Sequence, residues 1–297
     1  MQCSALHSTK GNRMSYDYDC INNGWLSIAH GDGVFVAVND FSNKSATSTD
    51  NGVTWTQHDM PAGEWGSIAY GDGVFVAVNS YSYTSATSTD NGKTWTRHDM
   101  PIGGWYSVAY GNGAFVAVNS YSYTSATSTD NGVTWTQHVM PNREWEGVAY
   151  GDGTFVAVSY SSSTSARSTD NGKTWTQHDM PIEGWRGITY GDGVFVAVSS
   201  SSSTSARSTD NGKTWTQHDM PIGGWCSVAY GDGVFVAVSY SSNTSVTSTD
   251  NGKTWTQHDM PDGDWCNVAY GDGVFVAVSS SSNTSVTSTD NGETWKG

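Results

Sequence analysis

Aspartate and histidine recur in this sequence at spacings that could serve metal binding or acid–base catalysis. Seven aspartates each belong to an S-T-D-N-G-x-T-W box. In six of the seven boxes a histidine follows the tryptophan by three residues. The box does not match the D-x-[DN]-x-[DN]-G spacing of a calcium loop. Histidines that occur once per repeat lie too far apart to share one metal ion. We therefore expect turns and hydrogen-bonded side chains here, with no metal and no cofactor. The aspartates are Asp50, Asp90, Asp130, Asp170, Asp210, Asp250 and Asp290, and the histidines are His58, His98, His138, His178, His218 and His258.

A 40-residue repeat positions these side chains. All 14 tryptophans fall into two series with a spacing of 40 residues, and no insertion or deletion separates the copies. The first series is Trp25, Trp65, Trp105, Trp145, Trp185, Trp225 and Trp265, and the second is Trp55, Trp95, Trp135, Trp175, Trp215, Trp255 and Trp295. A fixed period of this length is typical of a propeller or another repeat architecture.

Each copy contains the pattern of four short strands. In the second copy the strands are expected at Trp65–Tyr70, Val74–Val78, Ser85–Thr89 and Thr94–Asp99. A Gly-Asp-Gly turn joins the first two strands. The apolar run of the second strand implies burial on both faces, and no segment has helical periodicity.

These patterns predict an all-β fold, a seven-bladed β-propeller of four-stranded antiparallel blades. Residues 1–297 would form one domain, with blades starting near residues 25, 65, 105, 145, 185, 225 and 265. The seventh copy stops at Gly297, before its fourth strand is complete. Residues 1–24 align with the missing piece, so we expect about Met14–Cys20 to pair into the last blade and close the ring.

The seven boxes resemble those of the Asp-box family, also called bacterial neuraminidase repeats, with the pattern S-x-D-x-G-x-T-W. The resemblance covers about Trp25–Trp295. It implies a structural turn between the third and fourth strands of each blade. Family members include sialidases, other glycosidases, sugar-binding proteins and photosystem assembly factors, so the resemblance implies the fold and leaves the activity open.

Sialidases of that family use three arginines and carry an R-I-P motif, and a glycosidase in general needs two unlike carboxylates at one site. This chain has no R-I-P motif. Near-perfect repetition distributes like residues around a ring, and we expect no convergence on one pocket. We therefore expect that the protein is not an enzyme, and we rank a glycosidase below the binding functions. The six arginines are Arg13, Arg97, Arg143, Arg167, Arg186 and Arg207.

The copies differ mainly in three places, which an up-and-down blade puts on one face. They are the loop after the second strand, the loop after Met-Pro and the residue after the first tryptophan. Loops on a rigid scaffold are where binding sites normally lie, and aromatic rings beside polar groups suit a sugar. We expect ligand-binding residues in the grooves between blades: Trp65, Trp105, Trp145, Trp185, Trp225, Tyr81, Tyr83, Tyr121, Tyr123, Tyr160 and Tyr240. The alternative for the tryptophans is that their rings form part of the core between blades.

The leading hypothesis is a multivalent, lectin-like protein that binds glycans or glycoconjugates. The alternative is a protein-interaction or assembly scaffold with one asymmetric patch, which the irregular residues Tyr106, Arg143, Glu146 and Arg186 favour. A net charge of −15 opposes nucleic-acid binding. The sequence predicts no membrane insertion and no signal peptide. Its compartment is not determined, with the cytoplasm and non-classical secretion both open.

Overall fold

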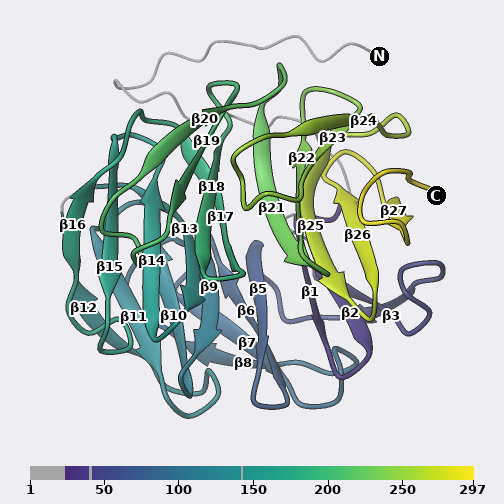
Figure 1. Ribbon diagram of the computed structural model, residues 1–297. Helices are drawn as coiled ribbons and strands as arrows, with labels where there is room; N and C mark the ends of the chain where they lie inside the picture. The colour runs from purple at the N-terminus through teal and green to yellow at the C-terminus, as the bar shows by residue number, and fades with distance from the viewer. Residues whose placement is uncertain (1–23, 40–41, 142) are drawn as a thin grey trace, which may run out of the picture.

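The computed structural model describes residues 24–39, 42–141 and 143–297. In these residues 27 strands form seven antiparallel sheets, and the strand order within each sheet follows the chain. Each sheet is one blade, and the first strands of successive blades lie side by side (Figure 1). The predicted seven-bladed all-β propeller is therefore confirmed, and the described residues contain no helix.

Each blade has its first strand innermost and its fourth strand outermost. The first strands are β1 (Ser27–Gly31), β5 (Trp65–Gly71), β9 (Trp105–Gly111), β13 (Trp145–Gly151), β17 (Trp185–Gly191), β21 (Trp225–Gly231) and β25 (Trp265–Gly271). The second strands are β2 (Val34–Val38), β6 (Val74–Asn79), β10 (Ala114–Asn119), β14 (Thr154–Ser159), β18 (Val194–Ser199), β22 (Val234–Ser239) and β26 (Val274–Ser279). The third strands are β3 (Lys44–Ser48), β7 (Thr84–Ser88), β11 (Thr124–Ser128), β15 (Thr164–Ser168), β19 (Thr204–Ser208), β23 (Thr244–Ser248) and β27 (Ser285–Ser288). The fourth strands are β4 (Thr56–Asp59), β8 (Thr96–Asp99), β12 (Thr136–Val139), β16 (Thr176–Asp179), β20 (Thr216–Asp219) and β24 (Thr256–Asp259).

The core lies between blades and is built from the second strands. Val36 and Val38 of β2 pack with Trp65 and Phe75 of the next blade, and both valines have 0% exposure. Phe35 of the same strand packs on its other face, with Val276 of the last blade, so consecutive residues are buried on opposite faces, as the apolar run predicts. Because each blade shields its neighbour, the apolar faces leave water only when the ring assembles.

The Asp box is a hydrogen-bonded turn. In the second blade, Asp90 Oδ1 accepts hydrogen bonds from the Thr94 amide and the Ser88 hydroxyl, both at 2.9 Å. Asp90 Oδ2 accepts the Thr94 hydroxyl at 2.7 Å, and Asn91 adopts a φ of 60°. Since these contacts hold Thr94 in the turn, the fourth strand begins two residues later than expected, at Thr96.

The box also joins neighbouring blades. The indole Nε1 of Trp95 donates to Ser45 Oγ of the preceding blade at 3.0 Å, and Ser45 Oγ donates to the Gly92 carbonyl at 3.2 Å. The same indole-to-serine bond recurs at each of the seven boxes. The repeated motif therefore has a structural role between blades.

The ring closes between the first and last blades, which lie side by side in Figure 1. The Trp25 amide donates to the Ser279 carbonyl at 2.8 Å, and the Trp55 indole donates to Ser285 Oγ at 2.8 Å. In the described residues the last sheet has three strands, with a single bridge between Thr287 and Lys296. The expected closing strand, Met14–Cys20, lies outside the described residues.

Candidate functional site

The connections that follow the second and fourth strands lie together at one end of each blade. In the second blade the Ser80 amide donates to the Glu64 carbonyl at 3.0 Å, and the Met100 amide donates to the Tyr83 carbonyl at 2.8 Å. We call this surface, formed by residues 79–84 and 99–106 and their described equivalents, the upper face. All three variable places of the repeat belong to it. The Gly-Asp-Gly and Asp-box turns lie at the opposite end.

The tryptophans at the start of the first strands do not reach that surface. Trp65, Trp105, Trp145, Trp185 and Trp225 all have 0% exposure. Their rings pack in the clusters between blades, and the indole of Trp65 donates to the Pro61 carbonyl at 3.1 Å. This corrects the expectation that these rings form part of a ligand-binding surface, because neighbouring blades cover both faces of each ring. They support the upper face from beneath.

The predicted tyrosines do lie on the upper face, and they are unevenly distributed. Tyr81, Tyr83, Tyr121 and Tyr123 belong to the second and third blades and are exposed, with Tyr81 at 61%. Ile102, between these two blades, is 71% exposed. Tyr160 and Tyr240 are half-buried single tyrosines in the fourth and sixth blades, where the other loop positions hold small polar residues. The upper face therefore has one aromatic side and lacks sevenfold symmetry.

A β-bulge follows the first tryptophan in six blades. In the fourth blade Trp145 pairs with Ser159 and Gly147 pairs with Val158, so Glu146 is an extra residue in the ladder. Bulges re-aim side chains and are over-represented next to functional sites. The sequence marks this position only by its variability. The bulge residues are Gly66, Tyr106, Glu146, Arg186, Cys226 and Cys266.

Three bulge residues and the adjacent loops form a polar cluster on the upper face. The Tyr106 and Tyr121 hydroxyls are 2.8 Å apart, and their ring centroids are 5.6 Å apart at an interplanar angle of 76°. The Ser120 hydroxyl donates to Glu146 Oε1 at 3.1 Å. We call Tyr81, Tyr106, Ser120, Tyr121, Glu146 and Arg186 the inner cluster.

Burial dominates the electrostatics of the inner cluster. It raises the pKa of Glu146, while the nearby charge of Arg186 and the hydrogen bond from Ser120 lower that pKa. Burial also raises the pKa of Tyr106, together with the Tyr121 hydrogen bond and the charges of Tyr81 and Glu146. A carboxyl group with a raised pKa beside phenols and a guanidinium can exchange protons or bind a charged ligand.

The next two bulge residues are the free cysteines Cys226 and Cys266. The Cys226 thiol donates to the Trp265 carbonyl at 3.2 Å, and the Cys266 thiol donates to the Trp25 carbonyl at 3.2 Å. Burial raises the pKa of Cys226 to about 11 and that of Cys266 to about 12. Both are therefore thiols at neutral pH and poor nucleophiles.

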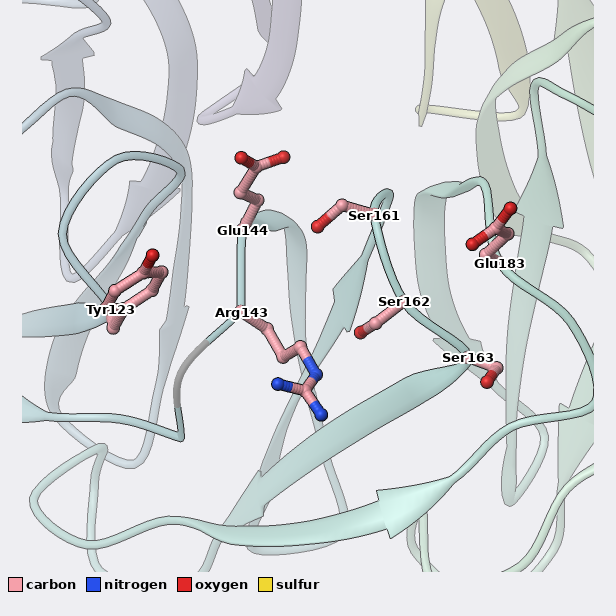
Figure 2. A pocket seen from close by; sticks show the side chains of 7 residues that line it. All are labelled: Tyr123, Arg143, Glu144, Ser161, Ser162, Ser163 and Glu183. Atoms are coloured by element: carbon pink, nitrogen blue, oxygen red, sulfur yellow. The ribbon is translucent and has the colours of Figure 1, made fainter. Parts of the chain in front are cut away.

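A second polar site lies farther out, in the groove between the third and fourth blades. A hollow of about 480 Å³ is lined by Tyr123, Arg143, Glu144, Ser161, Ser162, Ser163 and Glu183. Figure 2 shows the Arg143 guanidinium extending toward the serine loop, while the Glu144 carboxylate points away from it. The hollow contains a single arginine, Arg143, and Arg186 lies instead near Glu146 of the inner cluster.

Among the described residues, no three or more histidine, cysteine, aspartate or glutamate side chains gather as metal ligands would. The six outer-strand histidines are spread over six blades, and four of them contact a threonine hydroxyl, as His58 contacts Thr47 at 2.9 Å. In the part of the chain that is described, no helix is long and apolar enough to span a membrane.

The fold and the boxes define the class of protein: a seven-bladed β-propeller of Asp-box repeats. The BNR/Asp-box repeat family model matches residues 86–97, 166–177, 206–217 and 246–257. In the remaining boxes a threonine amide likewise donates a hydrogen bond to the aspartate, at Asp50, Asp130 and Asp290. No curated protein sequence matches this chain significantly.

Solved structures share the fold at low sequence identity. A streptogramin B lyase structure has a TM-score of 0.79 and 15% identity, over 88% of this chain and 92% of that chain. A catalytically inactive virginiamycin B lyase from Staphylococcus aureus with quinupristin has a TM-score of 0.78 and 14% identity, over 89% and 94%. YCF48 bound to D1 peptide has a TM-score of 0.69 and 14% identity, over 89% and 94%.

These similarities correct the expectation that the protein is not an enzyme. That expectation assumed that a regular propeller seldom builds one asymmetric site, yet the same architecture is the fold of a lyase. The chain itself assembles unlike side chains at its bulge positions. Neither the fold nor the repetition of the sequence is therefore a reason to exclude catalysis.

Proposed function

We propose that the protein binds a basic, lysine-containing segment of a partner protein on the second to fourth blades of its upper face. The observation that carries this proposal is the gathering of exposed aromatic and aliphatic side chains on two adjacent blades. Tyr81, Tyr83, Ile102, Tyr121 and Tyr123 are all exposed there. Exposed apolar groups that cluster in this way mark interaction surfaces, and tyrosine is enriched at protein interfaces.

Charge indicates which partner would fit. Next to the second to fourth blades, the loops between the fourth and first strands contain three carboxylates, Glu64, Glu144 and Glu183, against one cation, Arg143. The whole chain has a net charge of −15. Complementary charge accelerates association and selects against partners of the same sign. A basic segment with some apolar residues therefore matches this surface better than an acidic one.

The similarity to YCF48 supports a peptide ligand by analogy. That protein has the same fold and was solved bound to D1 peptide, at 14% identity to this chain. The similarity concerns the fold alone, so it suggests the type of ligand and no contact residues.

Carbohydrate binding is the second candidate, and the outer groove is the observation that favours it. There Tyr123 lies beside the hydroxyls of Ser161, Ser162 and Ser163 and the carboxylates of Glu144 and Glu183. A tyrosine ring and fixed polar groups suit the two faces of a sugar ring. The uneven distribution of tyrosines favours one or two sites over seven equivalent ones.

Synthetic peptides of equal length would test the proposal by biolayer interferometry on the full chain. One peptide alternates lysine with leucine, one replaces lysine with glutamate, and one replaces it with serine. We expect binding of the lysine peptide alone, weakened by salt. The double variant Ile102→Ser, Tyr83→Ser should bind about tenfold more weakly, which corresponds to roughly 1.4 kcal/mol.

Val53→Ser is the matched control, since Val53 is 73% exposed at the opposite end of the blade. Equal binding of the glutamate peptide, or an equal loss in Val53→Ser, would refute the proposed surface. A glycan array probed with the same protein tests the second candidate. Glycan binding that is lost in Tyr123→Ala, without any peptide binding, would make carbohydrate binding the better proposal.

A further inference from the structure

Tyr106 and Tyr121 form an aromatic corner within the inner cluster. Their rings meet at 76° with centroids 5.6 Å apart, and the bond between the hydroxyls fixes this angle. Gly104 allows this arrangement, because a Cβ at that position would lie 2.4 Å from Cδ2 of Tyr121. Two phenol rings of the third blade thus meet at one point.

A carboxylate lies beside these rings. Glu146 comes from the fourth blade, accepts the Ser120 hydroxyl at 3.1 Å and influences the pKa of Tyr106 by its charge. The face of an aromatic ring is negative and attracts a cation within about 6 Å of the ring centroid. Ring faces with an adjacent carboxylate thus attract cations and repel anions. Arg186, on the fifth blade, helps to keep the carboxylate ionised by lowering its pKa.

The fold does not require these side chains. Equivalent positions in other blades hold Leu26, Gly66 and Cys266, and those blades have the same strand order. Burial raises the pKa of Glu146, which means that the ionised side chain loses stabilisation by water. The fold does not need these side chains, and burial destabilises the ionised form of Glu146. Both observations are more consistent with a ligand site than with a packing role.

We infer that Tyr106, Tyr121 and Glu146 bind an alkylammonium group, such as the side chain of a lysine or methylated lysine in the partner. This inference rests on the proposed function and assigns one contact within it. The ammonium group would lie in the corner between the rings, beside the carboxylate. Apolar neighbours on the ligand would then contact Tyr83 and Ile102, which lie on the same side of the upper face.

A small probe isolates this contact from the rest of the surface. N-acetyl-trimethyllysine methylamide would be titrated into the full chain by calorimetry, beside its neutral isostere in which carbon replaces the quaternary nitrogen. We expect the cation to bind about tenfold more tightly than the isostere. Tyr106→Ala and Glu146→Gln should each weaken its binding by about tenfold. Tyr106→Phe should retain binding, because it keeps the ring.

Tyr240→Ala is the matched control, since Tyr240 is in the equivalent loop of the sixth blade, outside the proposed surface. Circular dichroism and melting temperature show that each variant is folded. Equal binding of cation and isostere, undiminished binding by folded Tyr106→Ala, or no binding of the probe would overturn the inference. Lysine-peptide binding that survives in Tyr106→Ala would leave the proposed function standing without this site.

Discussion

The Ser120 hydroxyl donates to Glu146 Oε1 across the boundary between the third and fourth blades. Because this bond stabilises the ionised carboxylate, it lowers the pKa of Glu146 against the larger effect of burial. Ser120→Ala should therefore raise that pKa further, as measured by NMR titration of the Glu146 carboxyl carbon. Ser200→Ala, the equivalent change two blades away, should leave it unchanged. A lower pKa in Ser120→Ala would contradict the bond.

Glu146 itself should reduce the stability of the fold at neutral pH. Its pKa in the folded protein is raised above the ordinary value of 4.5, so ionisation opposes folding above that pH. Glu146→Gln should raise the melting temperature at pH 7, and the difference should shrink as the pH falls through about 4.5. A difference that stays constant down to pH 3 would show that charge is not its cause.

The Asp boxes should make the protein sensitive to acid. Burial raises the pKa of Asp90, but the hydrogen bonds from Thr94 and Ser88 outweigh this effect and hold it below its ordinary value of 3.8. The stability that Asp90 contributes is thus present above pH 3.8 and is lost as the pH falls through the folded pKa. Thr94→Val should lower the melting temperature at pH 7 and reduce its further loss at pH 3. Thr96→Val, at an exposed position of β8, is the control.

Two glycines of one turn should differ in how they tolerate alanine. A Cβ on Gly111 would lie 2.0 Å from Cγ of Tyr150 in the next blade, whereas a Cβ on Gly113 meets nothing within 4 Å. Gly113 has a φ of 73°, so alanine there should cost about 1–2 kcal/mol of unfolding free energy. Gly111→Ala should cost more, about 3 kcal/mol, through displaced packing. Urea denaturation would rank the two, and the reverse order would contradict the packing.

Removal of residues 1–20 should lower the melting temperature. In the described residues the last sheet has three strands and the other sheets have four, so a closing strand from the start of the chain would complete the seventh blade. Differential scanning calorimetry of the shortened chain would test this prediction. An unchanged melting temperature would rule out a closing role for Met14–Cys20.

The fold could be predicted from the sequence because every copy repeats the same pattern of strand and turn residues. The two tryptophan series give the period and the number of blades, and the box and the Gly-Asp-Gly turn give the strand order. The Gly-Asp-Gly turn lies where the sequence predicts it, but its two glycines have different roles. Asp72 and Gly73 have φ values of 51° and 76°, whereas Gly71 is needed because the ring of Tyr110 packs against it.

The candidate site could be predicted only in part. The tyrosines of the upper face were found from loop variability, and Tyr106, Glu146 and Arg186 stood out as irregular residues. The burial of the first-strand tryptophans depends on the neighbouring blade, which a single repeat does not reveal. The bulge depends on the register between two strands, and no residue type marks it. The expectation that the protein is not an enzyme is wrong in its premise, because a repeated scaffold can hold different side chains at equivalent positions.

The bulge has a consequence for how such a protein can change. The bulge residue has no partner in the pairing of the first and second strands. Substitutions there therefore leave the ladder and the core between blades intact. Duplication of a blade therefore adds a structural unit and, on the upper face, a bulge position at which the residue type can change. A ring of near-identical copies can in this way acquire a site with no symmetry, by single substitutions and without rebuilding its frame.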